Sequence, residues 1–481
     1  MSTVTNYSVA VLGVALLGGC TVVGPNYQRP EMELPPAWTA TATPEPTTSI
    51  LAVGERWWML YKDPQLDALQ EEALNHNGDV QVAAARILEA RAQAGISDAD
   101  RAPVVYGAVG ARRTQSSQVS SNPLPAGTPR TQNDYRATLE ASYELDMWGR
   151  YQRSSEAARA TLMAAESSRE TVRLTLTAEV ARRYFSLLTA DARERVLRRT
   201  VESHEESLKL VRLRLAAGVA AQFDLDVAQA AEAAARIQLA QALLAREQEE
   251  ATLAVLLGRS PRAVMAGVIA RGTVITSIPS LAVPAGLPSE LLLRRPDLRV
   301  AEQQLIAENA RIGAVRAQLF PAITLTAFLG GESATLSDLF SGPAGIYQFA
   351  GNLTQPLFNA DRLRHAQAAA QARRDQVLAL YRVAVANAFA DVRSALAAQE
   401  SARLTLNLNS QRGEALHRAY QQAAQRQAAG LTSRLELLDS ERQTLQAELA
   451  QLDATLIQRT TAVALIKTLG GGWSSQGVDS R

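Results

Sequence analysis

The sequence predicts an α/β membrane protein in which very long helices alternate with pairs of membrane-crossing strands. Three features predict this class: helical stretches of unusual length, an internal two-fold repeat, and segments in which apolar and polar residues alternate strictly. After residue 20, no apolar run reaches the length of about 20 residues that a transmembrane helix needs. If the chain crosses a membrane, it must therefore do so with strands.

Two stretches of the chain are too long and too free of helix breakers for a compact globular domain. Residues 150–217 contain neither Gly nor Pro, and residues 357–429 contain only Gly413. At 1.5 Å per residue, an unbroken helix over the first stretch would be about 100 Å long. A further helical pattern begins near Pro64 and runs to about Ala102. The longest helices must pack against one another along their length.

The two halves of the chain repeat each other, with a period too long for a solenoid. At an offset of 212, Ala216-Ala217-Gly218 matches Ala428-Ala429-Gly430. An offset of 218 aligns Asp79, Val82, Ala83, Ala92, Gly95, Ala99 and Pro103 with Asp297, Val300, Ala301, Ala310, Gly313, Ala317 and Pro321. Each half therefore contains a helix, a strand pair, a very long helix, a turn and a medium helix.

This repeat predicts the boundaries of the segments. The first repeat spans residues 63–270, with a strand pair at 103–146, a long helix at 150–217 and a helix at 219–257. A linker at 271–288 leads to the second repeat at 289–470. Its strand pair is expected at 321–357 and its two later helices at 359–429 and 431–469, before a C-terminal tail at 471–481.

The predicted strands alternate as membrane barrel strands do, with apolar residues facing lipid and polar residues facing inward. A soluble half-buried hairpin would show the same alternation, but two hairpins at matching places in a repeat favour the membrane. One face of the first pair carries Tyr135, Ala137, Leu139, Ala141, Tyr143 and Leu145, and one face of the second carries Ile323, Leu325, Ala327 and Leu329.

Four strands per chain cannot close a barrel, because the smallest membrane barrels have about eight strands. Open strand edges in lipid would leave backbone groups without partners, at a cost of several kcal/mol each. The residues therefore predict a barrel that is shared between copies of the chain, and they do not set the number of copies.

The N-terminus predicts a lipid anchor. Cys20 is the only cysteine, and the apolar run before it is too short to span a bilayer. Leu17-Gly18-Gly19-Cys20 resembles the bacterial lipobox, although residues 2–8 lack Lys and Arg. We expect a lipoprotein signal peptide at 1–19 and a covalent lipid on Cys20, which begins an extended segment at 20–62. The alternative is an ordinary signal peptide with an incidental cysteine.

Composition argues against several other classes of protein. The 49 basic and 48 acidic residues give a net charge of +1, which argues against a nucleic-acid-binding surface. The four histidines lack the spacing of metal ligands, and no nucleophile elbow or phosphate-binding loop occurs. We therefore expect no enzymatic activity, no metal and no cofactor other than the lipid.

Three stretches carry a resemblance to a known family: "VVGPNYQRP" at 22–30, "WWMLYKDPQLDALQEEAL" at 57–74 and the residues from Leu292 to Leu325. The chain resembles the outer membrane factor (TolC-like) family, in the lipoprotein subgroup that partners resistance-nodulation-division pumps. The resemblance implies a homotrimer, with a 12-stranded barrel continuous with a periplasmic α-helical barrel. It also implies a passive exit duct for small molecules, partnered by a periplasmic adaptor and an inner-membrane pump.

The resemblance also implies a gate at the turns after the two longest helices, residues 218–226 and 430–439. Glu436, Asp439 and Asp224 lie where the family carries acidic residues that point into the tunnel, and Arg434 is a candidate tip latch. Close carboxylates would attract cations. The alternative is that these acids are solvated residues at helix starts, where the helix dipole favours them.

Two other functions remain open at this stage. One is an outer-membrane duct for type I protein secretion. The other is a non-conducting coiled-coil lipoprotein that acts as a spacer, although a spacer would not need the alternating strands.

Overall fold

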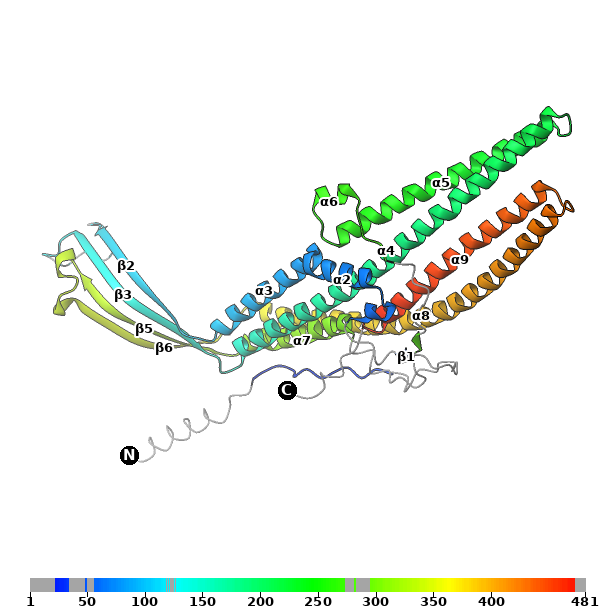
Figure 1. The fold of residues 1–481 in the computed structure, drawn as a ribbon. Coiled ribbons are helices and arrows are strands. Elements are labelled where there is room, and N and C mark those ends of the chain that lie inside the picture. The colour runs from blue at the N-terminus through cyan, green and yellow to red at the C-terminus, as the bar shows by residue number, and fades with distance from the viewer. Residues whose placement is uncertain are drawn as a thin grey trace. The chain divides into compact units, whose positions relative to one another are not determined.

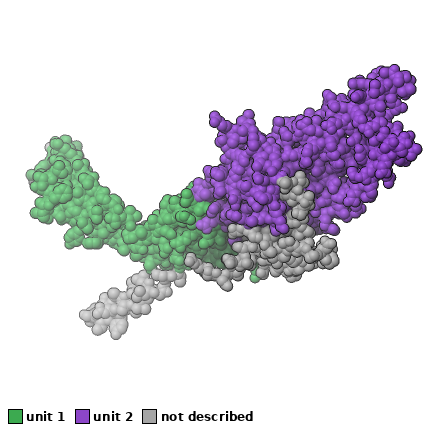
Figure 2. Space-filling model, viewed as in Figure 1, with its two compact units in different colours: residues 1–31, 86–165, 300–381 green, residues 32–85, 166–299, 382–481 purple. Residues whose placement is uncertain are grey.

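The computed structural model describes residues 22–33, 48–49, 56–117, 119, 121, 125, 127–272, 281–282 and 295–471. The chain divides into two compact units, and each unit draws on both sequence repeats (Figure 2). The first unit comprises residues 1–31, 86–165 and 300–381. The second comprises residues 32–85, 166–299 and 382–481.

The first unit contains a four-stranded antiparallel sheet in the order β2-β3-β5-β6 (Figure 1). Because β3 pairs with β5, the hairpins of the two repeats form one sheet, and Leu139 lies opposite Leu329. The prediction of four strands per chain is confirmed. The strands are β2 (Val104–Gln115), β3 (Thr131–Leu145), β5 (Ala322–Ser333) and β6 (Gly345–Thr354).

The helices confirm the two-fold repeat, because three helices of the first half have counterparts of equal length in the second half. The paired helices have 22, 67 and 35 residues. These pairs are α3 (Gly78–Ala99) with α7 (Pro296–Ala317), α4 (Arg150–Ala216) with α8 (Arg362–Ala428), and α5 (Gln222–Leu256) with α9 (Arg434–Thr468). In the part of the chain that is described, no helix has both the length and the apolar composition needed to cross a membrane.

In the second unit, four helices lie side by side in the order α5-α4-α9-α8 (Figure 1). Polar contacts join each neighbouring pair along the layer. They are Arg183 Nη1 to Glu249 Oε2 at 3.0 Å (α4 to α5), Ser203 Oγ to Glu441 Oε2 at 3.0 Å (α4 to α9), and Gln451 Nε2 to Ser410 Oγ at 3.3 Å (α9 to α8).

The expected helix from Pro64 to about Ala102 is wrong as a single helix, because the structure breaks it at Asn77. Its first part is α2 (Pro64–His76), and α3 begins at Gly78. Asn77 is extended, with ψ at 132°, and its Oδ1 accepts hydrogen bonds from the amides of Asp79 and Val80. Asn77 therefore ends one helix and caps the next.

The core of the second unit surrounds an aromatic group just before the first repeat. Trp57 and Tyr61, in the short helix η2 (Trp57–Tyr61), are each 2% exposed and pack with Phe185. Trp57 therefore packs against the helices. The smaller elements are α6 (Pro261–Ala266), the parallel pair β1 (Thr48–Ser49) and β4 (Leu281–Ala282), and two single turns, η4 (Leu336–Asp338) and η5 (Gly342–Ala344).

Candidate functional site

One face of the sheet is apolar across all four strands. The strand register sets Val105 opposite Ala141, Ala141 opposite Ala327, and Ala327 opposite Phe349, so these side chains form one row. Val105 is 59% exposed and Phe349 is 77% exposed. Monomeric soluble proteins rarely expose a continuous apolar surface of this kind, so this face is a candidate lipid contact.

The opposite face of the sheet is polar and carries cross-strand charge pairs. Arg112 Nη2 lies 3.3 Å from Asp134 Oδ2, and Arg136 Nη1 lies 3.8 Å from Glu332 Oε2. The Arg136 guanidinium also lies 4.5 Å from the centre of the Phe328 ring. A sheet that is apolar on one face and charged on the other fits a boundary between lipid and water.

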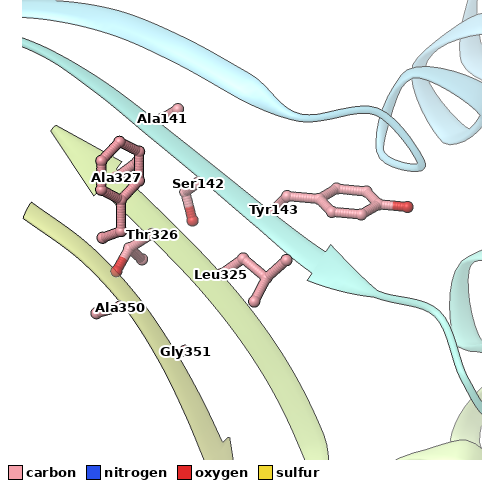
Figure 3. Close-up of a pocket in the computed structure, with 9 residues that line it drawn as sticks. Ala141, Ser142, Tyr143, Leu325, Thr326, Ala327, Ala350 and Gly351 are labelled. Atoms are coloured by element: carbon pink, nitrogen blue, oxygen red, sulfur yellow. The ribbon is translucent and has the colours of Figure 1, made fainter.

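A hollow of about 430 Å³ lies against β3, β5 and β6 (Figure 3). Tyr143 and Leu325 are register partners beside it, and Gly351 leaves space on β6 because it has no side chain. None of the lining residues carries a charge. They are Ala141, Ser142, Tyr143, Leu325, Thr326, Ala327, Phe349, Ala350 and Gly351.

The two outer strands of the sheet present free edges. Within the residues that the structure describes, β2 pairs only with β3 and β6 pairs only with β5. Each outer edge therefore offers a row of backbone donors and acceptors to a further strand. One edge strand, β2, comes from the first repeat and the other, β6, comes from the second. The β2 edge of each copy can therefore pair with the β6 edge of the next copy, and this pairing can repeat until the ring closes.

The two helix-hairpin tips have the same backbone design. Gly218 and Gly430 follow α4 and α8 with φ of +71° and +73°, a conformation that glycine adopts without strain. Asp224 lies in the first turn of α5 and Glu436 in the first turn of α9. Both carboxylates are exposed.

Each of these two carboxylates accepts a hydrogen bond from a backbone amide at the start of its own helix. Asp224 Oδ2 lies 2.9 Å from the amide nitrogen of Ala221, and Glu436 Oε2 lies 3.2 Å from that of Ser433. These bonds cap the two helices, and the exposure of both acids at helix starts is compatible with the alternative of solvated residues favoured by the helix dipole. This geometry leaves both side chains at the tip surface, and the acidic ring stays a prediction.

Asp439 and Arg434 also lie at the second tip. Asp439 accepts hydrogen bonds from Arg442 at 2.8 Å and from Gln443 at 2.9 Å, both on its own helix. Arg434 instead reaches α4, where its Nη2 lies 2.6 Å from Glu206 Oε1. Arg434 therefore ties the two hairpins of one chain together. No sequence pattern indicates Glu206 as its partner.

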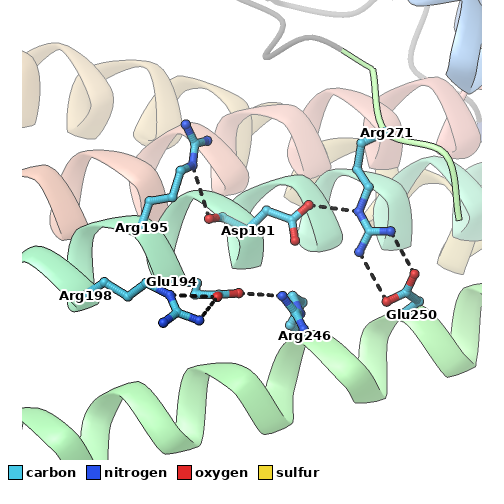
Figure 4. Close-up of polar contacts among 7 residues, drawn as sticks. All are labelled: Asp191, Glu194, Arg195, Arg198, Arg246, Glu250 and Arg271. Atoms are coloured by element: carbon cyan, nitrogen blue, oxygen red, sulfur yellow. Dashed lines mark hydrogen bonds and ion pairs between the residues drawn. The ribbon is translucent and has the colours of Figure 1, made fainter. Parts of the chain in front are cut away.

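A charge network that no sequence pattern indicates fixes the segment after α6 to the α4–α5 hairpin (Figure 4). Arg271 donates to Asp191 Oδ2 at 3.0 Å and to Glu250 Oε1 at 2.7 Å, and the Ile269 amide donates to the same Glu250 oxygen at 3.0 Å. Burial alone would raise the pKa of Glu250, but the hydrogen bonds from Arg271 and Ile269 hold that pKa below its ordinary value.

The same hairpin holds a second bridging carboxylate. Glu194 accepts from Arg198 on α4 and from Arg246 on α5, each at 2.6 Å. These contacts stiffen the α4–α5 pair. Among the described residues, no three His, Cys, Asp or Glu side chains lie close enough together to hold a metal ion.

Comparison with known proteins identifies the family. A model of the outer membrane efflux protein family matches residues 69–259 and 287–471. The chain belongs to the outer membrane efflux protein family. It is similar to the probable efflux pump outer membrane protein TtgC of Pseudomonas putida, with 34% identity over 96% of this chain and 94% of that protein.

Two further members of the family bear on membrane attachment and on the fold. The probable outer membrane lipoprotein SilC of Salmonella typhimurium is 33% identical over 97% of this chain and 98% of its own length. The crystal structure of the Campylobacter jejuni CmeC outer membrane channel matches with a TM-score of 0.88 and 25% identity. It covers 95% of this chain and 96% of that chain.

The fold and the family together give the cellular role. This outer membrane efflux protein is the outer-membrane channel component of an efflux system. Its four-stranded sheet with one apolar face and its long helices match the fold class expected from the sequence. The resemblance to the outer membrane factor family is therefore confirmed.

Proposed function

We propose that three copies of this protein form one closed channel that acts as a passive exit duct. The observation that carries this proposal is the sheet with one apolar face and two free edges. Three such sheets, joined β2 to β6, make a 12-stranded barrel with no open edge in lipid. The helical layer has α5 at one edge and α8 at the other. In the trimer, α5 of each copy would pack against α8 of the next copy, and the three layers would form a closed helical cylinder.

The duct would work with a periplasmic adaptor and an inner-membrane pump that supplies the energy. The efflux-pump relatives support this partnership. We propose no enzymatic step for the chain, because in this arrangement the pump would supply the energy and select the substrates. Its substrates would be small molecules that the pump delivers.

A covalent lipid on Cys20 would hold the protein in the outer membrane. Cys20 lies outside the described residues, so support comes from the lipobox-like sequence and from the similarity to SilC. Radiolabelled palmitate should be incorporated into the wild-type protein and not into Cys20→Ser. Persistent labelling of Cys20→Ser would show that the site is wrong.

At the periplasmic end, Glu436, Asp439 and Asp224 would line a narrow passage. Three copies would bring these carboxylates close to one axis, where they would attract cations. The purified full-length protein, reconstituted in planar bilayers, should therefore form cation-preferring pores. A complete absence of conductance would contradict the duct and favour a structural spacer.

A further inference from the structure

The segment Val22–Arg29, which follows the lipidation cysteine, is bonded to the first unit at almost every polar side chain. Arg29 donates from Nε and Nη2 to both oxygens of Glu302, each at 2.7 Å. The Tyr27 hydroxyl donates to the same carboxylate at 3.1 Å, and Asn26 Oδ1 accepts from Arg153 at 2.7 Å. A paired guanidinium and carboxylate with two parallel hydrogen bonds is among the strongest polar contacts in proteins.

The Glu302 carboxylate, on α7, is the centre of this contact. Its side chain is 12% exposed, whereas that of Arg29 is 55% exposed. Burial and the Glu302 charge raise the pKa of Tyr27 above its ordinary value, so Tyr27 stays a hydrogen-bond donor at any physiological pH. Without this segment, Glu302 would lose the three donors described here.

Glycines allow residues 22–24 to lie very close to the helices and turns of the first unit. A Cβ on Gly24 would lie 2.5 Å from Gly313 Cα, and one on Gly149 would lie 2.5 Å from Val22 Cγ1. A Cβ on Gly313 would lie 2.9 Å from the Val23 carbonyl oxygen. Side chains at these positions would push the segment away.

Two backbone contacts fix where the segment lies in the first unit. The Val23 amide donates to the Trp148 carbonyl oxygen at 3.0 Å, just after β3, and Asn309 Nδ2 donates to the Pro25 carbonyl oxygen at 2.9 Å. Trp148 in turn stacks on Phe320, just before β5, with ring centres 4.7 Å apart. The segment therefore starts at the end of the sheet where the strands join the helices.

The covalent chain then limits where the lipid can be. Cys20 precedes Val22 by two residues, so their Cα atoms are at most about 7 Å apart. We propose that residues 22–29 form an anchor clasp that holds the acylated Cys20 at the helix end of the sheet. The acyl chains, which reach about 15 Å into one leaflet, then set the depth of the apolar sheet face in the membrane. This inference rests on the proposed lipidation of Cys20.

The clasp can be opened without touching the cysteine. Glu302→Gln removes the charge that holds Arg29, and Gly313→Val fills the contact under Val23. Arg29→Gln is a milder variant on an exposed side chain, which protects the test against a folding defect. Glu308→Gln is the matched control, because Glu308 lies on the same helix and pairs with Arg311 and not with the clasp.

Two measurements on the purified, reconstituted protein test the clasp. A nitroxide attached to Gln28→Cys reports the mobility of the clasp by electron paramagnetic resonance. In Glu302→Gln the mobile fraction of the nitroxide should rise about tenfold, which corresponds to a loss of about 1.4 kcal/mol of binding free energy between the clasp and the first unit. A photoreactive palmitate incorporated in cells reports the position of the lipid. Its adducts should concentrate near residues 139–149 and 320–325 and fall severalfold in the opened variants, while Glu308→Gln matches wild type.

The outcomes separate this inference from the lipidation itself. A second reactive thiol in Gln28→Cys protein, or no palmitate in wild type, would overturn both the lipidation and the clasp. In a variant whose nitroxide has become mobile, palmitate incorporation could stay normal while the adduct pattern stays unchanged. That result would overturn the clasp and leave the lipidation of Cys20 standing.

Discussion

Arg434, at the first turn of α9, binds Glu206 on α4, with Nη2 and Oε1 2.6 Å apart. The two residues are 228 positions apart in the sequence. Both side chains are partly exposed, at 40% and 52%, so the pair contributes little to folding stability. Because the pair lies near the tips, we expect it to limit how far the two hairpins of one chain can separate.

Arg434→Ala should therefore change gating and not folding. Without this tie, the two hairpins of a chain separate more easily, and single-channel recordings should show a larger open probability. Arg418→Ala is the matched control, because Arg418 pairs with Glu414 within one helix. Identical recordings for the two variants would mean that the Arg434 contact has no part in closure.

Glu436→Gln with Asp439→Asn should weaken the cation preference of the pore. Removing these exposed carboxylates removes six negative charges from a trimer, so the reversal potential in a salt gradient should move toward zero. Glu414→Gln, on α8 away from the tips, should leave the reversal potential unchanged. An unchanged potential in the double variant would show that these acids do not face the passage.

Phe349→Arg and Gln348→Arg form a matched pair on β6, because consecutive strand residues point to opposite faces. Arginine at 349 places a charge on the apolar face, at a cost of about 2–4 kcal/mol if that face meets the middle of the bilayer. We expect Phe349→Arg to reduce the protein recovered from outer-membrane fractions, and Gln348→Arg to insert normally. Equal recovery of the two variants would contradict the assignment of the lipid face.

Arg271→Ala should destabilise the second unit by about 2 kcal/mol at pH 7, because it leaves the buried Glu250 carboxylate without its charge partner. Arg198→Ala is the control, since Glu194 keeps Arg246. The apparent melting temperature measures the difference between the two variants.

The loss caused by Arg271→Ala should also depend on pH. The pKa of Glu250 is lowered in the folded protein, so its contribution is present above the unfolded-state pKa and disappears as pH falls through the folded-state pKa. The gap between Arg271→Ala and wild type should therefore shrink on acidification. A gap that stays constant as the pH falls from 7 to below the folded-state pKa of Glu250 would assign the effect to lost packing.

Much of the fold could be predicted because it follows from local patterns. Period-two alternation around Leu139 predicted a strand, and the match of Gly218 with Gly430 predicted two equivalent tips. The helix break at Asn77 could not be predicted, because Asn can also continue a helix. Its side chain caps α3 and also donates to the Leu256 carbonyl oxygen, and a contact with a residue 179 positions away has no local sequence pattern.

The contacts at the candidate sites were less predictable. Glu206 and Asp191 are acids within a long helix and no local pattern marks them. Arg434 comes to Glu206 from another helix, and Arg271 comes to Asp191 from the segment after α6. The "VVGPNYQRP" stretch carries the family resemblance in the sequence, but its contacts with Glu302, 273 residues away from Arg29, follow only from the fold. Charge partners across elements carry no periodic signal, so sequence patterns do not reveal them.

The number of copies in the purified particle tests the central claim most directly. Native mass spectrometry of the detergent-solubilised protein should give three chains per particle, because one chain supplies a third of the barrel and leaves two sheet edges open. A particle of one chain, soluble without detergent, would contradict this account.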